Sequence, residues 1–335
     1  MSSVIRWGLL STARINGAII PRLHEGARHA LVAVASRDVH RAADYAKEWG
    51  IPRAHGSYEA LLADPDVDVI YNPLPNSLHV EWSVKAMRAG KHVLCEKPIA
   101  LTVEEVATLQ QVSSQTGRIV TEAFMYRHHP QTRVVRDLVT GGAIGAPRLV
   151  RGTFSFMLNR PGDVRYDRAM GGGALWDVGC YPVSYARYVL SGEPVEACCT
   201  QVVGDTGVDL TSAGYLRFDA DVLCLFDCSY RAASRASIEV VGAEGTIEVP
   251  TPYKPGLAES LVVRRGTDTE IRHVEGAPLY AGELDDMAGA ILDGAAPEVS
   301  LDESLGNTVA LLALHTSARL GHPVPVARPP RSEGP

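Results

Sequence analysis

Three side chains able to handle protons lie beside turns of this 335-residue chain. Lys97 follows a short apolar run and precedes Pro98. Asp177 and Tyr181 are four residues apart in a segment that opens with the glycines 171–173. If that segment is helical, the carboxylate and the phenol emerge on one face. A cation nearby would lower the pKa of the phenol from about 10, so the three groups together could exchange a proton with a substrate.

Each of these residues also has a purely structural interpretation. A lysine in a loop is usually solvated, and Asp177 could simply favour the dipole of a helix N-terminus. Tyr181 would then be a half-buried packing residue. The position of Lys97 at the carboxyl end of a strand favours the chemical interpretation, because ligands of open parallel sheets lie beyond that edge.

The loop after the first expected strand, residues 11–15, is a candidate phosphate site. A dinucleotide fingerprint needs small residues there, so that the backbone and a helix N-terminus can approach a pyrophosphate. Ser11 and Ala13 are small but are not glycine. On this loop alone, an ordinary turn between strand and helix remains an alternative.

The end of the second expected strand favours NADP over NAD. Enzymes that use NAD usually carry an acidic residue there. Here Ser36 and Arg37 occupy the position, with Arg41 one helical turn on. A hydroxyl and a guanidinium bind a 2′-phosphate through charge-assisted bonds. Asp38 could instead cap the following helix, and a solvated surface role for Arg37 stays open.

The elements that would position these residues alternate between strand and helix. Short apolar runs are expected as buried strands, and the segments between them have helical spacing. Thr102 and Glu105 form a capping box, and Gly50 can end the second helix. This alternation predicts a parallel sheet with helices on both faces. The strands are expected at 5–10, 31–35, 67–71, 91–95 and 118–121.

After about residue 123 the pattern becomes rich in β-strands and predicts neighbouring antiparallel strands of one open sheet. Two later helices are expected near 283–292 and 301–320. The predicted domains are 1–123, which binds the dinucleotide, and 124–322, which binds substrate and forms oligomers. Residues 323–335 are expected as a frayed, proline-rich tail. The β-segments are expected at 148–157, 196–203, 214–218, 222–230, 237–241 and 245–249.

Composition excludes several classes of partner. The 32 Lys and Arg against 39 Asp and Glu give a net charge of −7, which disfavours nucleic acid and anionic membranes. Six cysteines without a C-x-x-C pair are expected as reduced thiols, with no metal site. No signal peptide and no apolar run of about 18 residues is recognised, so a cytoplasmic protein is expected.

Three motifs together resemble the GFO/IDH/MocA oxidoreductases. They are residues 74–79 (LPNSLH), the Glu-Lys-Pro of 96–98 and the glycine-rich segment 171–181. The resemblance extends to about residue 320. It implies an α/β Rossmann domain with a doubly wound parallel sheet, followed by an α+β domain with an open, mostly antiparallel sheet. It also implies NADP-dependent hydride transfer to or from a sugar, keto-sugar or cyclitol.

The family's motifs assign roles residue by residue. Lys97 would hydrogen-bond the reacting oxygen, Asp177 would orient the substrate, and Tyr181 would exchange the proton. Position 181 is His in members like inositol dehydrogenase and Tyr in the glucose–fructose oxidoreductase and ketoreductase branch. With less direct support, the substrate pocket would also include Arg127, His128 and Arg165. The resemblance assigns cofactor contacts to Ser11, Thr12, Ala13, Arg14, Ile15, Leu74, Pro75, Asn76, His79, Glu96 and Lys97, beside Ser36, Arg37 and Arg41.

Three alternatives remain at this stage. A trans-dihydrodiol dehydrogenase acting on aromatic diols would share the site. A non-catalytic dinucleotide sensor would have the same fold, although the presence of Lys97, Asp177 and Tyr181 together argues against it. A cofactor retained and recycled in one active site is also compatible. The open sheet and the resemblance together predict a homodimer or homotetramer.

Overall fold

The computed structural model describes residues 4–327, which divide into two compact units. The first comprises residues 4–128 together with 280–304, and the second comprises 129–279 together with 305–327. Residues 124–128 and the segment 280–304 therefore belong with the dinucleotide-type unit. The sequence pattern had assigned both to the second domain.

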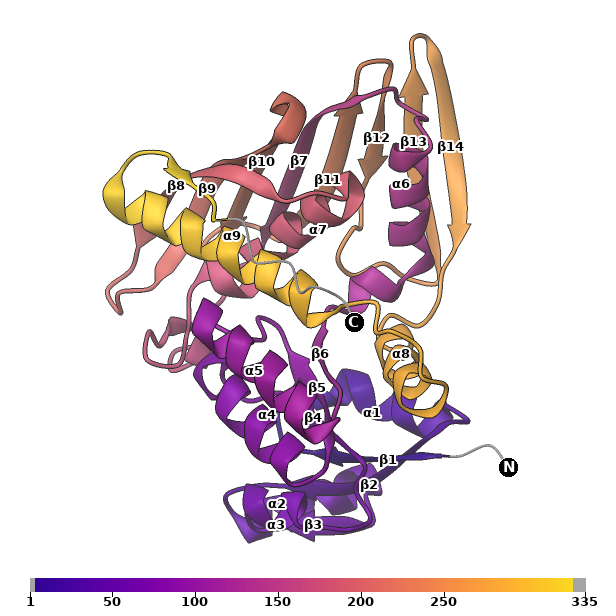
Figure 1. Cartoon of the computed structure of the whole chain (residues 1–335), viewed down its shortest axis with the longest axis vertical. Helices are drawn as coiled ribbons and strands as arrows, with labels where there is room; N and C mark the ends of the chain where they lie inside the picture. The colour runs from indigo at the N-terminus through magenta and orange to yellow at the C-terminus, as the bar shows by residue number, and fades with distance from the viewer. Residues whose placement is uncertain (1–3, 328–335) are drawn as a thin grey trace. The chain divides into compact units, whose positions relative to one another are not determined.

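The first unit is built on a six-stranded sheet in which every strand pair is parallel (Figure 1). The order β3-β2-β1-β4-β5-β6 is that of a doubly wound dinucleotide-binding sheet, which confirms the predicted fold class. The strands are β1 (Ile5–Leu9), β2 (His29–Ala35), β3 (Arg53–His55), β4 (Val69–Asn72), β5 (His92–Glu96) and β6 (Val120–Ala123).

Helices connect these strands, and their ends follow from local sequence. Asp38 caps α2, whose end is set by Gly50 in the left-handed conformation, and Thr102 and Glu105 complete the capping box of α5. The helices of the unit are α1 (Asn16–Glu25), α2 (Val39–Trp49), α3 (Tyr58–Leu62), η1 (Asn76–Leu78), α4 (His79–Arg88), α5 (Val103–Thr116), η2 (Met125–His128) and α8 (Ala281–Leu292).

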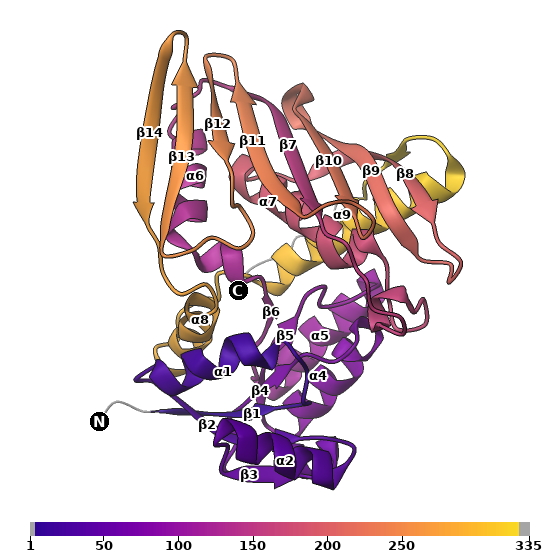
Figure 2. The same ribbon diagram turned by 180° about the vertical axis from the view of Figure 1, so that it is seen from behind.

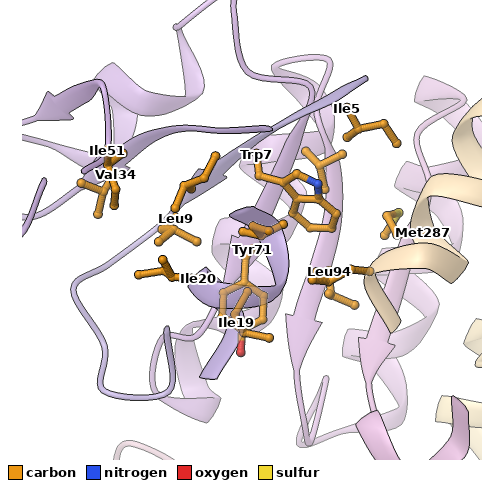
Figure 3. Close-up of a cluster of buried hydrophobic side chains, with 14 of the residues drawn as sticks. Ile5, Trp7, Leu9, Ile19, Ile20, Val34, Ile51, Tyr71, Leu94 and Met287 are labelled. Atoms are coloured by element: carbon orange, nitrogen blue, oxygen red, sulfur yellow. The ribbon is translucent and has the colours of Figure 1, made fainter. Parts of the chain in front are cut away.

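The core of the unit draws on segments far apart in the sequence (Figure 3). Trp7 of β1 and Ile19 of α1 are fully buried and belong to the same hydrophobic cluster. Leu284 and Met287 of α8 belong to the same cluster and are also fully buried. Each such side chain contributes roughly 1.5–3 kcal/mol by leaving water. The late segment is therefore part of this domain's core.

The second unit contains a nine-stranded sheet of order β14-β13-β12-β11-β7-β10-β9-β8-β15. Helices α6, α7 and most of α9 cover one face, and Figure 2 shows the opposite face without a helix. The strands are β7 (Pro147–Ser155), β8 (Pro194–Val203), β9 (Asp209–Phe218), β10 (Leu223–Ser229), β11 (Arg235–Gly242), β12 (Gly245–Val249), β13 (Ala258–Arg265), β14 (Asp268–Glu275) and β15 (Val324–Pro325). The helices are α6 (Pro130–Thr140), η3 (Val164–Tyr166), the π-helix η4 (Leu175–Gly179), α7 (Cys180–Leu190), η5 (Asp219–Asp221) and α9 (Leu301–Leu320).

The expected open, mostly antiparallel sheet is confirmed. Two details differ from expectation. β7 and β10 pair in parallel, so the neighbouring strands are not antiparallel throughout. The expected frayed tail begins with β15, which pairs with β8 through Val324 and Ala197. Backbone hydrogen bonding to an edge strand orders this segment despite its prolines. The rest of the predicted tail, 328–335, lies outside the described residues.

Candidate active site

The predicted cofactor residues follow four strands of the first unit at one edge of its sheet. Because all six strands are parallel, their carboxyl ends share that edge, where open α/β sheets bind ligands. Residues 11–15 follow β1, residues 36–41 follow β2, residues 74–79 follow β4, and 96–97 end β5.

The loop after β1 has an unused hydroxyl. The Oγ of Ser11 is buried, and it has no hydrogen-bond partner within the described part of the chain. The Nδ2 of Asn16 donates to the carbonyl oxygen of Ser11 at 2.7 Å and so fixes the loop. No side chain caps the start of α1. A buried hydroxyl beside an uncapped helix N-terminus fits a phosphate group, despite the missing glycines.

The segment after β2 presents two arginines. The carboxylate of Asp38 accepts from the backbone N–H groups of His40 at 2.8 Å and Arg41 at 3.2 Å, so it caps α2 as the sequence suggested. Burial raises the pKa of Tyr58, and the charges of Arg37 and Arg41 oppose that rise. Both guanidinium groups therefore lie near the phenol hydroxyl. Within residues 4–327, neither arginine forms an ion pair with a carboxylate.

The turn after β5 carries Lys97. The Lys97–Pro98 peptide bond is cis. The hydroxyl of Tyr71 donates to Oε1 of Glu96 at 2.6 Å, and the backbone N–H of Lys97 donates to Oε2 at 3.3 Å. Glu96 is thus held as an acceptor from both sides, and it fixes the start of the turn that carries Lys97.

His79 holds two loops together, whereas a direct cofactor contact was expected. Its ring is fully buried, with Nδ1 2.7 Å from the carbonyl oxygen of Pro98 and Nε2 2.7 Å from that of Leu74. Burial lowers the pKa of His79 to about 4. The ring therefore links the turn after β5 to the loop after β4, and any effect on a ligand passes through those loops.

Arg127 and His128, expected in the substrate pocket, are buried in η2 of the first unit. The Nη1 of Arg127 lies 3.2 Å from Oε2 of Glu303. The ion pair joins η2 to the start of α9, so Arg127 has a structural role. Its contact with substrate stays a prediction, as does that of His128.

In the second unit, Asp177 is held by Arg165. The Nε of Arg165 donates to Oδ2 of Asp177 at 2.7 Å, and the side chain of Asp177 is 12% exposed. The negative charge of Asp177 raises the pKa of Arg165. Arg165 is also 3.4 Å from Asp163, which caps η3. The structure thus brings together two of the predicted substrate residues.

The glycine-rich segment continues into a helix, the condition set for placing Asp177 and Tyr181 on one face, but the first turn of that helix is a π-helix. Asp177 lies within this π-helix, and Tyr181 lies in the first turn of α7. The simple spacing of an α-helix therefore does not apply between them. Single π turns are frequent at functional sites.

Asp209 anchors the start of this segment. Its Oδ2 accepts from the backbone N–H of Leu175 at 2.7 Å and from Ser212 at 2.7 Å. Gly173 has a φ of +125°, and a Cβ there would lie 2.2 Å from Oδ1 of Asp209. Only glycine allows this approach. The hydroxyl of Tyr230 also donates to the carbonyl oxygen of Gly173 at 3.0 Å.

Tyr181 is 4% exposed and lies in an aromatic cluster. Its ring is edge-on to Phe154 at 5.2 Å and tilted against Tyr253 at 5.4 Å, measured between centroids. Phe154 and Tyr253 are stacked at 5.0 Å. These contacts limit the rotamers of Tyr181 and fix the direction of its hydroxyl.

The sequence analysis missed Tyr58, Tyr71 and Glu283. Tyr58 and Tyr71 contact predicted site residues, but in sequence they look like ordinary core aromatics. Glu283 lies on α8, and only the return of that helix to the first unit reveals its surroundings. Among residues 4–327, no three His, Cys, Asp or Glu side chains gather in a metal-binding group, and no helix is long and apolar enough to cross a membrane.

Comparison with known proteins agrees with this arrangement. Residues 5–124 match the model of the oxidoreductase family with an NAD-binding Rossmann fold, and residues 132–248 match that of the GFO/IDH/MocA C-terminal domain. The chain is 35% identical to D-xylose 1-dehydrogenase (NADP(+)) 2 of Haloferax volcanii, over 94% of this chain and 98% of the relative. It is 34% identical to trans-1,2-dihydrobenzene-1,2-diol dehydrogenase of Danio rerio, over 73% and 74%.

A solved structure is similar over nearly the full length. It is a 3-ketoreductase from Actinomadura kijaniata in complex with NADP and TDP-benzene, with a TM-score of 0.89 and 30% identity, covering 94% of this chain and 98% of that one. The family matches and the full-length relatives confirm the resemblance seen in the motifs. The chain belongs to the GFO/IDH/MocA family of NAD(P)-binding oxidoreductases.

Proposed function

We propose that the protein is an NADP(H)-dependent oxidoreductase acting on a CH–OH or C=O group of a sugar, keto-sugar or cyclitol. One observation carries the choice of NADP. The single carboxylate near the end of β2, that of Asp38, is engaged in capping α2, while Arg37 and Arg41 are exposed beside it. A 2′-phosphate would meet two cations there and no competing anion.

The first unit would hold the cofactor along its carboxyl edge. Ser11 and the start of α1 would bind the pyrophosphate, and Ser36, Arg37 and Arg41 would bind the 2′-phosphate. The turn at 96–98 and the loop at 74–79 would border the nicotinamide end. When bound, the nicotinamide accepts or donates the hydride.

The proton would move through this chain's own side chains. Tyr181 would exchange a proton with the substrate oxygen, and Lys97 would hydrogen-bond that oxygen and stabilise its negative charge. Asp177, held by Arg165, would orient a substrate hydroxyl. Lys97 belongs to the first unit and Asp177 and Tyr181 to the second, so their joint action is part of the proposal.

The substrate class is supported by the relatives. One is a D-xylose 1-dehydrogenase by its name, and another, from Actinomadura kijaniata, is a dTDP-3,4-didehydro-2,6-dideoxy-alpha-D-glucose 3-reductase by its name. The second candidate is a dehydrogenase of aromatic diols, supported by the relative from Danio rerio. Both would use the same side chains, so only substrates can distinguish them.

The test is fluorescence titration with NADPH and NADH, followed by turnover on pentoses, hexoses, inositols, keto-sugars and aromatic diols. Tight NADPH binding with weak NADH binding supports the phosphate site, and the panel then selects the substrate. Turnover with aromatic diols alone would favour the second candidate. Binding without turnover would favour a sensor, and binding of neither nucleotide would refute the proposal.

A further inference from the structure

Glu122, the third residue of β6, has a buried carboxyl group that none of the roles above uses. The residue is 2% exposed. Its Oε1 accepts from the backbone N–H of Ile99 at 3.0 Å, and its Oε2 accepts from the hydroxyl of Ser304 at 2.7 Å. Each oxygen thus has a donor, as a buried polar group requires. One of the two donors belongs to the backbone just after the turn that carries Lys97.

Glu122 holds that turn from its far end. The side chain of Glu96 and the ring of His79 bond to the backbone of the turn at 96–98 itself. The bond from Ile99 to Glu122 fixes the chain where it leaves the turn. At 3.0 Å this bond is also shorter than the 3.3 Å bond that the first N–H of the turn makes to Glu96.

Water cannot replace Glu122 at this position. Ile99 and Ala100 are both fully buried, so the N–H of Ile99 depends on an acceptor within the protein. If residue 122 were apolar, this N–H would lose its acceptor and the segment would shift to find another. Ile99 is two residues from Lys97, so such a shift would displace the Lys97 side chain. A displacement of about 1 Å is costly for a group that must meet a reacting atom.

The carboxyl of Glu122 is itself fixed from the opposite side. Ser304, whose hydroxyl holds Oε2, lies in the first turn of α9. On the same strand, the hydroxyl of Thr121 donates to the carbonyl oxygen of Val299 at 2.7 Å. β6 is therefore bonded twice to the segment 299–304, which belongs to the same unit. These bonds make Glu122 a fixed acceptor for Ile99.

We propose that Glu122 is a positioning residue for Lys97: a fixed acceptor that holds the backbone of Ile99 and thereby sets where the Lys97 ammonium lies. This inference rests on the proposed function, in which Lys97 contacts the reacting oxygen. Glu122 acts through the backbone and is assigned no contact with substrate or cofactor. The proposed role requires an oxygen that accepts from Ile99, and it does not require a negative charge.

The test compares Glu122→Met, which removes both acceptors, with Glu122→Gln. The glutamine oxygen accepts from Ile99, and its amide donates to Ser304, whose hydroxyl is also an acceptor. We expect Glu122→Met to lower kcat about tenfold, because Lys97 is displaced, and Glu122→Gln to keep kcat within about twofold of wild type. The Kd for NADPH should stay within about twofold in both variants, since the phosphate contacts are assigned to other loops.

Thr121→Val is the matched control. Thr121 is equally buried and also bonds β6 to the segment before α9, but it makes no bond to the turn. Its kcat should stay within about twofold of wild type. A loss in Thr121→Val equal to that in Glu122→Met would mean general loosening of β6, and an equal loss in Glu122→Gln would mean that the charge matters. Either result, or a wild-type kcat in Glu122→Met, overturns the inference.

A shorter side chain covers the case in which Glu122→Met does not fold. Glu122→Asp keeps the carboxylate but withdraws it by one methylene from Ile99. We expect its kcat to fall about threefold or more with a Kd for NADPH within about twofold of wild type. A wild-type kcat in Glu122→Asp would then overturn the inference.

Amide hydrogen exchange, followed by mass spectrometry, tests the hold on the turn without any substrate. Residues 97–101 should exchange slowly in wild type, Glu122→Gln and Thr121→Val, and about tenfold faster in Glu122→Met. Equal exchange in Glu122→Met and wild type would refute the inference even if the protein proved to be the proposed oxidoreductase. Faster exchange in Glu122→Met, with no turnover of any substrate by wild type, would support the hold on the turn and count against the proposed function alone.

Discussion

The Nε of Arg165 donates to Oδ2 of Asp177 at 2.7 Å, and this bond fixes the carboxylate inside a π turn. Asp177→Asn keeps the shape but removes the charge and leaves the guanidinium without its main partner. We expect kcat/KM to fall by about 100-fold with an unchanged Kd for NADPH. Asp163→Asn is the matched control, because Asp163 contacts the same arginine at 3.4 Å. Equal losses in both variants would contradict a specific role for Asp177.

Lys97→Ala should abolish most turnover while leaving cofactor affinity nearly intact. The ammonium is assigned to the reacting oxygen, and such groups contribute roughly 100- to 10,000-fold. Steady-state kinetics and NADPH titration measure the two effects separately. Lys85→Ala, which removes an exposed lysine paired with Glu81, should leave both unchanged. Loss of NADPH binding alone in Lys97→Ala would argue against the assignment.

Arg37→Ala should weaken NADPH binding by about tenfold or more and leave NADH binding unchanged, since one charge-assisted bond to the 2′-phosphate is lost. Fluorescence titration with both nucleotides gives the ratio directly. The control is Arg88→Ala, an exposed arginine at the end of α4. Equal weakening of NADPH and NADH would show that Arg37 does not discriminate between them.

Stability should fall in mild acid because of buried histidines. Burial lowers the pKa of both His79 and His92 to about 4. The unfolded chain binds these protons near pH 6.5, whereas the folded chain does not, so the stabilisation present above pH 6.5 is lost as pH falls towards 4. His79→Gln should reduce the drop in Tm between pH 6.5 and 4, and His24→Gln, on an exposed side chain, should not. A Tm that stays constant in wild type over this range would contradict the prediction.

The bare face of the nine-stranded sheet predicts self-association. Leu225 on β10 and Ile271 on β14 are 39% and 60% exposed. An antiparallel sheet can leave one face to solvent, but large apolar side chains exposed on that face favour its burial by a second copy of the chain. Sedimentation at micromolar concentration should give a dimer or tetramer, and Leu225→Glu should shift it towards smaller species. A monomeric wild type would exclude this.

Much of the fold could be predicted because buried parallel strands and capped helices leave local signals. Continuous apolar runs identified β1 and β5, and Thr102 identified the start of α5. β3 was not predicted, because Arg53–His55 is short and polar. β13 and β14 were not predicted either, because charged residues interrupt the alternation of apolar and polar side chains in these strands. Such strands are specified by their neighbours in the sheet more than by their own sequence.

The site could be predicted only in part, for a related reason. Lys97, Asp177 and Tyr181 stand in recognisable motifs. The contacts that hold them involve distant residues such as Asp209 and Tyr71, and no spacing rule connects these to the motifs. For His79 the motif is recognisable in the sequence, but its structural role is not. That role depends on contacts with two carbonyl oxygens from separate loops.

The return of α8 has a consequence for how this protein can be made. Leu284 and Met287 fill the core between β1 and α1, so that core stays incomplete until the ribosome has passed residue 292. A fragment cut at residue 128 would expose an apolar surface that the intact chain buries, and it should aggregate when expressed alone. The nucleotide domain is thus compact in space but discontinuous in the sequence. It can finish folding only after the inserted part of the second domain has been synthesised.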